Sequence, residues 1–359
     1  MRTRDWQGWA RRNTTNLLRV AIVALFVALA VWAITLNRYG LVIANREPWL
    51  WLTVALVSVG PELAGIVIGV VTIDYLNERR QDEQLKEQLI RQMGMNIRDV
   101  AVAAVRELAH HGWAYDGSLS GAFFADADLR MAHLEEAALS QANFERASLD
   151  GASLWKANLS EAKLSRADLT TAGLARADLS RADLNEANLG GANLSSADLT
   201  GADLRYSSLV LADLSGAMML EALLYRANLT KANLRLAYLS KAELGRANLT
   251  GANLADSFLT DAFLCMANLY ETHLYWADLM GANLNEARNW TIHQLEQAAV
   301  LDGATMPDGT KLRHWVTVQQ ERTEGPTFEE WKAEYLARHG GATDTLRDTG
   351  VADNGPAAG

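Results

Sequence analysis

The most regular feature of the sequence is a hydrophobic position that recurs every five residues from Leu119 to Leu284. Leucine occupies 31 of these 34 positions, and the others hold Phe124, Phe144 and Met219. A small residue lies two positions earlier, and it is alanine in 30 of the 34 units. The residue between the two is most often Asp, Asn or Ser. The register of this pattern never slips along the segment.

A period of five matches neither the 3.6-residue period of an α-helix nor the two-residue period of a simple strand. It predicts a chain that turns a corner every five residues, with the leucine and the alanine pointing inward and the other three residues outward. Four units close a square turn of 20 residues, and successive turns pair backbone to backbone at about 4.8 Å. Residues 117–288 are therefore predicted to form a rod of stacked square turns about 40 Å long.

The repeated unit A(D/N)LXX, as in Ala167-Asp168-Leu169, strongly resembles the pentapeptide-repeat family. The resemblance implies a mainly β fold, a right-handed quadrilateral parallel β-helix known as a pentapeptide-repeat solenoid. The stretch from Glu62 to Gly117 is similar to the membrane-plus-helix leader of some bacterial pentapeptide-repeat proteins. It implies a membrane-anchored bacterial member of the family. A family of this kind defines a fold and does not settle a function.

Two apolar segments precede the repeats and predict a transmembrane hairpin. Residues 17–36 and 49–73 are each about as long as a helix that crosses the hydrocarbon core of a bilayer. A cleaved signal peptide is the alternative for the first segment, although its apolar run is long for that role. Basic residues flank the pair on its two outer sides: Arg2, Arg4, Arg11, Arg12 and Arg19 before it, and Arg79, Arg80, Lys86 and Arg91 after it. The positive-inside rule then predicts a multi-pass protein of the cell inner membrane with both termini in the cytoplasm.

The second apolar segment contains a carboxylate, Glu62, which is costly near the middle of a bilayer. Gly65 and Gly69 lie three and seven residues later, on the same helical face, and form a small-xxx-small pair. This face is a candidate transmembrane packing face that points at another helix. An ion or proton site is the alternative, but one acidic residue does not make a pathway.

A charged segment, 74–112, follows and predicts a helical stalk with an apolar stripe on one side. The stripe is formed by Leu85, Leu89, Met93, Ile97, Val100, Ala104 and Leu108. It could form a coiled coil between copies of the chain, or it could pack on the end of the β-helix. Gly94 is expected to interrupt the helix, and Asn96 with Asp99 predicts a capping box for a second helix.

Further helices are predicted after the repeats, because the last turn of a repeat rod needs a cap. Thr291 and Gln294 form a capping box, and Phe328, Trp331 and Tyr335 share one face of a helix from about 327 to 338. The predicted order is 1–16 basic cytoplasmic N-terminus, 17–36 and 49–73 transmembrane helices, 74–112 helical stalk and N-terminal cap, 117–288 β-helix, 289–339 C-terminal helical cap region and 340–359 disordered tail.

Composition narrows the function further. The chain has 359 residues, a formal net charge of −10 and one cysteine, Cys265. These values argue against general nucleic-acid binding and exclude an intramolecular disulfide framework. No nucleotide-binding, hydrolase or metalloprotease motif is present, and His110-His111 fits a helix end better than a metal site. We therefore expect no catalytic residue, no cofactor and no metal, and a protein that is not an enzyme.

Two functions fit this sequence. The first is a non-enzymatic interaction scaffold, displayed on the cytoplasmic side of a lipid bilayer and binding an unknown protein. The second is implied by the family, some members of which resemble DNA and act on DNA gyrase. Residues 117–288 contain 21 acidic and 14 basic residues, a modest acidic surplus for such a mimic. Nine basic residues lie two positions after the leucine: Arg146, Lys156, Arg166, Arg176, Arg181, Arg226, Lys231, Lys241 and Arg246.

One group of outward residues stands out from the polar pattern. Met218, Tyr238 and Phe258 are spaced by 20 residues and therefore lie one above another, just before the inward position. Leu220 and Met280 are three turns apart in the next outward column. These five residues form a candidate protein-binding strip. A ladder that only stabilises adjacent turns is the alternative, and a second copy of the chain is as good a candidate occupant as a foreign protein.

Overall fold

The structure is a computed structural model, which describes residues 49–313, 315–316, 321–322 and 325–339. Within these residues, side chains are described from Gly69 onward, except for Val71 and those of 315–316 and 321–322. The chain divides into two compact units, 1–85 and 86–359, and each is considered by itself. The helices are α2 (Trp49–Met93), α3 (Arg98–His110), α4 (Ile292–Glu296) and α5 (Phe328–Arg338). Two short strands, β1 (Trp315–Val316) and β2 (Glu321–Arg322), form an antiparallel pair.

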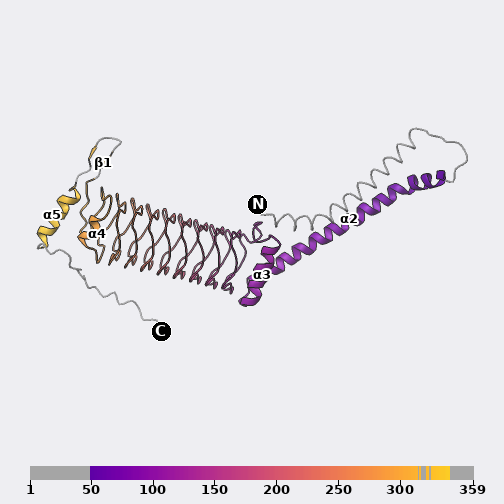
Figure 1. Cartoon of the computed structure of the whole chain (residues 1–359), viewed down its shortest axis with the longest axis horizontal. Coiled ribbons are helices and arrows are strands. Elements are labelled where there is room, and N and C mark those ends of the chain that lie inside the picture. Colours follow the sequence, from indigo (N-terminus) through magenta and orange to yellow (C-terminus); the bar gives the residue numbers. More distant parts are fainter. Residues whose placement is uncertain (1–48, 314, 317–320, 323–324, 340–359) are drawn as a thin grey trace. The chain divides into compact units, whose positions relative to one another are not determined.

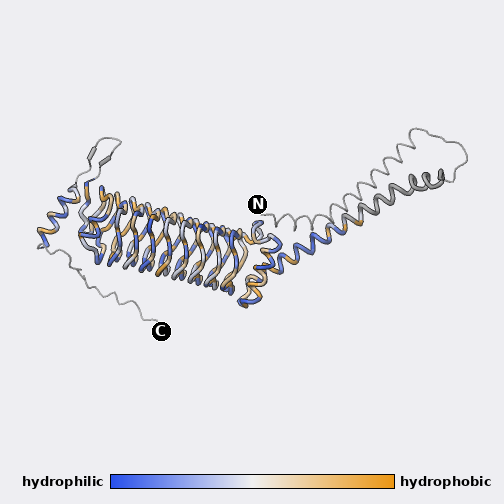
Figure 2. Tube along the Cα trace, viewed as in Figure 1, coloured by the Kyte–Doolittle hydropathy of each residue, from blue (hydrophilic) through white to orange (hydrophobic). Residues whose placement is uncertain are grey.

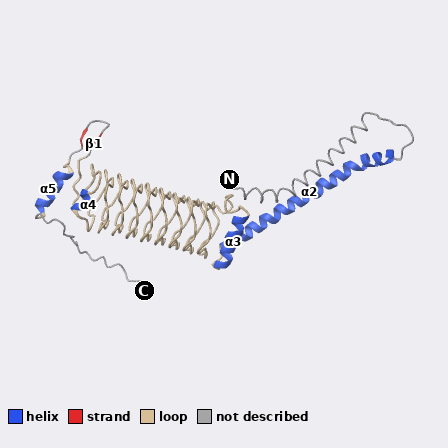
Figure 3. Cartoon of the chain, viewed as in Figure 1, coloured by secondary structure: helices blue, strands red, loops and turns tan. Residues whose placement is uncertain are grey.

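The repeats wind into the predicted parallel β-helix with 20 residues in each turn (Figure 1). Parallel bridges join residues that are 20 apart, from Phe123 with Asn143 to Asn268 with Arg288. Each face of each turn contributes a single bridging residue, so the coil is drawn as loop rather than strand (Figure 3). The quadrilateral solenoid and its register are confirmed.

The interior of the solenoid is a stack of leucine and alanine side chains. All 34 repeating hydrophobic positions are no more than 2% exposed. Hydrophobic and hydrophilic residues accordingly alternate along every turn (Figure 2). Ser207 and Ser257 replace the alanine in two units, and each hydroxyl donates a hydrogen bond to a backbone carbonyl three residues earlier, at 2.7 and 2.6 Å. These bonds satisfy the polar atoms inside an apolar column, as burial requires.

The corners of the solenoid use left-handed backbone at the residue two after the leucine. Arg176, for example, has φ of 59°, and its N–H donates to the carbonyl of Ser195 in the next turn at 3.0 Å. Left-handed backbone is uncommon for residues other than glycine. It persists here because the stacked turns fix the corner from both sides. The nine basic residues identified in the sequence all occupy this corner position.

The first turn of the solenoid is covered by helices. Leu89 and Met93 at the end of α2 are buried in the same core as Val105 and Leu108 of α3. This part of the predicted stripe therefore packs on the β-helix, whereas Ile97 is 58% exposed. The break after Met93 agrees with the prediction from Gly94.

The predicted capping box of α3 is wrong. The N-cap residue is Ile97 rather than Asn96, and the N-cap makes no side-chain hydrogen bond. The shift arises because the carbonyl of Ile97 accepts the N–H groups of Val100 and Ala101, which starts the helix one residue later. At the other end of α3, His110 and His111 terminate the helix as expected.

The last turn is covered by α4, α5 and the segment between them. The capping box of Thr291 and Gln294 is confirmed. Buried Gln294 also donates to the carbonyls of Leu269 and Thr272, at 2.8 and 2.9 Å, and so satisfies the backbone of the final full turn. Trp331 of α5 is 2% exposed, and its ring nitrogen donates to Asp308. The aromatic face of α5 is thus confirmed, whereas the β1–β2 pair has no counterpart in the sequence predictions.

The structure gives the predicted transmembrane hairpin no support. The second predicted span, 49–73, lies in α2, which continues without a break into the stalk. Among the described residues, no helix is both long enough and apolar enough to cross a membrane. The first predicted span, the basic N-terminus and the tail 340–359 lie outside the described residues.

Candidate protein-binding surface

One face of the solenoid carries the residues of the predicted strip. We name it face A, and its inward residues are Leu119, Leu139 and every twentieth residue to Leu279. The outward column before these residues holds Asn158, Asp178 and Asp198 in the first half of the rod and then Met218, Tyr238 and Phe258. The last three side chains are 47%, 50% and 40% exposed. Bridges join Met218 to Tyr238 and Tyr238 to Phe258, so the vertical alignment predicted from the sequence is confirmed.

Two rings of the strip stack on each other, and much of the strip is exposed to solvent. The rings of Tyr238 and Phe258 are nearly parallel, at an interplanar angle of 12°, with centroids 5.0 Å apart. Leu220 in the neighbouring column is 41% exposed, and Met280 is half-buried. Stacking therefore covers one side of each ring, and a substantial apolar area stays in contact with solvent.

Two further apolar residues extend the strip at its corner. Leu236 and Trp276 lie two residues before members of the face A column, two turns apart, and are 46% and 58% exposed. Asp256 lies between them in the same corner column and forms an ion pair with Arg235 at 3.0 Å. The spacing of 40 residues between Leu236 and Trp276 was the sequence signal that could have revealed this extension. The face A strip is hereafter the set Met218, Leu220, Leu236, Tyr238, Phe258, Trp276 and Met280.

Carboxylates predominate around the face A strip. Asp198 and Asp278 continue the Met218 column at its two ends. Glu221, Lys241 and Asp261 follow one another in the corner column beside Leu220, and all three are exposed. These three make no ion pair with another described residue. The border of the strip is therefore negative overall.

The neighbouring face carries a second aromatic group that sequence reasoning missed. The rings of Tyr225 and Phe263 close over Gly245, whose absent Cβ would lie 3.3 and 3.4 Å from them. Tyr206 meets Tyr225 edge to face at a centroid distance of 5.9 Å. Tyr206 and Phe263 are still 50% and 44% exposed, but the contacts with Gly245 and between the two tyrosine rings give this group a structural role.

Polar ladders occupy the same kind of position elsewhere on the rod. The amide of Asn268 donates to Asn248 at 3.1 Å, and the amide of Asn188 donates to Thr170 at 2.8 Å. At one corner the guanidinium of Arg146 donates to Asp126 at 2.8 Å, and this bond lowers the pKa of the Asp126 carboxyl. These contacts give the polar columns a structural role between adjacent turns.

The candidate packing face of Glu62, Gly65 and Gly69 stays a prediction, because the surroundings of Glu62 and Gly65 lie outside the description. Beyond its own stretch of helix, no described atom lies within 4 Å of the position that a Gly69 Cβ would occupy. Burial raises the pKa of the Cys265 thiol, which disfavours the reactive thiolate. His111 stacks on Trp113 at 4.3 Å. Across the described residues, no group of three or more potential ligands could hold a metal ion.

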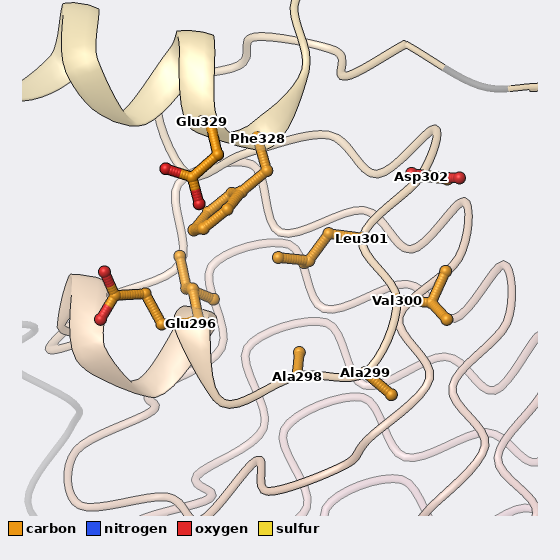
Figure 4. A pocket seen from close by; sticks show the side chains of 9 residues that line it. Glu296, Ala298, Ala299, Val300, Leu301, Asp302, Phe328 and Glu329 are labelled. Atoms are coloured by element: carbon orange, nitrogen blue, oxygen red, sulfur yellow. The ribbon is translucent and has the colours of Figure 1, made fainter.

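A depression of about 320 Å³ lies in the C-terminal cap between α4, the segment 298–302 and the start of α5 (Figure 4). Leu295, Leu301 and Phe328 supply its apolar lining. The carboxylate of Glu296 at its edge is paired with Lys332, and this hydrogen bond lowers the pKa of Glu296. Two carboxylates of the lining, Glu296 and Glu329, thus already share Lys332 as a partner.

Comparison with known proteins agrees with this geometry. The family of pentapeptide repeats matches in eight copies over residues 116–174 and 177–285. HetL of the cyanobacterium Nostoc sp. strain PCC 7120, a pentapeptide repeat protein involved in the regulation of heterocyst differentiation, is 37% identical with a TM-score of 0.51. That match covers 54% of this chain and 86% of HetL. The chain belongs to the pentapeptide-repeat family.

Other similar proteins add no functional information. Rfr23, a pentapeptide repeat protein of the cyanobacterium Cyanothece 51142, is 40% identical over 26% of this chain and 62% of its own, with a TM-score of 0.24. QnrB1, a plasmid-mediated fluoroquinolone resistance protein, is 16% identical over 56% of this chain and 95% of its own. Its TM-score is 0.34, a level that supports no inference. No curated protein matches the chain.

Proposed function

We propose that this pentapeptide-repeat protein is a non-enzymatic interaction scaffold that binds another protein through the face A strip. The observation that carries this proposal is the half-exposed column of Met218, Tyr238 and Phe258, in a column that holds Ser, Ala, Asn and Asp in the first half of the same face. Contiguous exposed apolar surface on a soluble domain often marks a contact site. Aromatic side chains and methionine are also enriched at the centres of protein interfaces.

The arrangement of the strip favours a contact site over a simple ladder. A ladder explains the stacking of Tyr238 on Phe258, because cross-strand aromatic pairs stabilise adjacent turns. It does not explain Leu220 and Trp276, which are 41% and 58% exposed and lie in the columns on either side. A surface three columns wide is what a partner would cover.

The proposed location is the cytoplasmic side of the cell inner membrane, and its support comes from sequence. The two apolar segments, 17–36 and 49–73, and their flanking arginines motivate it. Alkaline phosphatase fused after Gly359 should be inactive, and the same enzyme inserted between Asn37 and Glu47 should be active. The reverse pattern would overturn the cytoplasmic location.

No specific observation supports the alternative, a DNA mimic that acts on gyrase. A mimic needs an uninterrupted negative surface resembling phosphates. The corner columns instead expose guanidinium groups, such as Arg146 and Arg166, which form ion pairs with acidic residues one turn away. The apolar face A strip has no counterpart on a phosphate backbone either.

Site-specific cross-linking tests the scaffold directly. A photoreactive residue placed at Tyr238 in the full-length chain should cross-link to a discrete protein in the cells that make it. The same residue at Asn158, in the same column of the polar half, is the matched control and should give no such product. Equal labelling at both positions would reject the face A strip as the contact site.

A further inference from the structure

The charge around the face A strip indicates what kind of partner would fit it. Seven carboxylates border the strip or continue its columns, against two cations. The carboxylates are Asp198, Glu221, Glu243, Asp256, Asp261, Asp278 and Asp302, and the cations are Arg235 and Lys241. Arg235 is already paired with Asp256. The remaining field is negative, and complementary charge on a partner steers its approach and fixes its orientation.

The spacing of the strip also restricts the shape of the partner. The rings of Tyr238 and Phe258 are 5.0 Å apart along the rod. One turn of an α-helix rises about 5.4 Å, so a helix lying along the rod stays within about 1 Å of register over two turns. Alternate residues of a strand are about 6.7 Å apart and lose register by more than about 3 Å over the same length.

We propose that the face A strip binds an amphipathic helix of a partner protein that carries basic residues beside its apolar face. Apolar residues at i, i+3 or i+4 and i+7 of that helix pack across Met218, Tyr238 and Phe258, the spacing by which amphipathic helices present their apolar face to a partner. Its lysines or arginines lie against Glu221 and Asp261. This inference rests on the proposed function and adds the charge and the secondary structure of the partner.

A synthetic helix provides the test. The probe is a peptide of about 14 residues, about 21 Å long as a helix, with leucines on one face and lysines on its flanks. The comparison peptide has the same leucines and glutamates in place of the lysines. Fluorescence anisotropy with the full-length chain should give a Kd at least about tenfold lower for the lysine peptide. Equal or tighter binding of the glutamate peptide would overturn the inference.

Variants with matched controls separate the two contributions. The double substitution Tyr238→Ser with Phe258→Ser should weaken lysine-peptide binding at least about tenfold. Leu211→Ser removes a side chain that is 63% exposed at another corner, and it should leave binding unchanged. The pair Glu221→Gln and Asp261→Asn should weaken binding several-fold and reduce its salt dependence. The pair Glu107→Gln and Glu286→Gln removes equal charge outside face A and should have no effect. All variants are first matched for melting temperature.

The outcomes distinguish this inference from the proposed function. If neither peptide binds while the cross-link at Tyr238 persists, the partner is not a basic helix and the scaffold function stands. If the cross-link joins two copies of the chain and the double serine variant becomes monomeric, the occupant is a second copy and the inference is wrong. If cross-linking and peptide binding are both absent, the proposed function and the inference are both rejected.

Discussion

The two halves of face A share a backbone and an interior but differ on the outside. Leu179 in the first half and Leu239 in the second are both fully buried in the same inward column. Outside, Asp178 accepts hydrogen bonds from the N–H and hydroxyl of Ser180, whereas Tyr238 stacks on Phe258 and stays half-exposed. The same fold therefore carries a polar surface whose side chains hydrogen-bond to one another and an apolar surface that stays exposed.

This difference shows that the inward residues determine the fold, whereas the outward residues can vary. Each turn is held by inward leucine and alanine side chains and by backbone hydrogen bonds to its neighbours, and neither depends on the outward columns. Stability in repeat proteins is approximately a sum of local terms between adjacent repeats. Outward residues can therefore change over a few turns without disturbing the rest of the rod.

A lysine introduced into the interior should destabilise the protein equally in the two halves, and this is the largest effect we expect. Leu179→Lys and Leu239→Lys each place an ammonium group in a sealed apolar column, which costs at least about 4 kcal/mol. Thermal melts of the full-length chain should show similar large losses for both. Ser196→Lys, at an exposed corner where lysine occurs elsewhere, should change stability by less than about 0.5 kcal/mol. A loss confined to one half would mean that the two interiors are not equivalent.

A destabilising substitution in the C-terminal cap should lower stability only in the second half of the rod. Trp331→Ala removes a ring that is 2% exposed and packs among Trp290, Phe328 and Tyr335, at a cost of about 3 kcal/mol. Hydrogen exchange should become faster for backbone amides of the last turns, near Leu269, and stay unchanged near Leu139. Uniformly faster exchange along the rod would contradict the local view of repeat stability.

The sequence predicted the periodic part of the molecule almost completely, because one side-chain period determines both register and burial. Leu119 to Leu284 could be placed inward, and Met218, Tyr238 and Phe258 aligned, by arithmetic in steps of 20. The β1–β2 pair, the start of α3 at Ile97 and the cover of Tyr225 and Phe263 over Gly245 were not predicted. They depend on single hydrogen bonds and ring contacts, which leave no repeated signal in the sequence.

The apolar strip itself should contribute more to association than to stability. Tyr238→Ser with Phe258→Ser removes one stacked pair, which is worth about 1 kcal/mol. Asp178→Ala in the polar half removes two hydrogen bonds at a similar cost. Melting temperatures of these variants should therefore be similar, while only the double serine variant loses its co-purified partner. A much larger loss of stability with unchanged association would identify the strip as a ladder.

The smallest expected effect concerns the charges at one corner column. In the first half, the hydrogen bond from Arg146 lowers the pKa of Asp126 below its ordinary value of 3.8. A carboxyl whose folded-state pKa is lowered adds stability above its unfolded-state pKa and loses that stability as the pH falls through the folded-state value.

Arg146→Gln should therefore raise the pKa of Asp126 in an NMR titration. It should also lower the melting temperature slightly at pH 7, and this difference should vanish below the lowered pKa of Asp126. Arg246 occupies the same column five turns later and has no ion pair among the described residues, so Arg246→Gln is the matched control. Its melting temperature should follow that of the unmodified chain from neutral pH into this acidic range. A pH-dependent difference for Arg246→Gln would show that the second half of the rod also uses this column for stability, and the contrast between the halves would then be confined to face A.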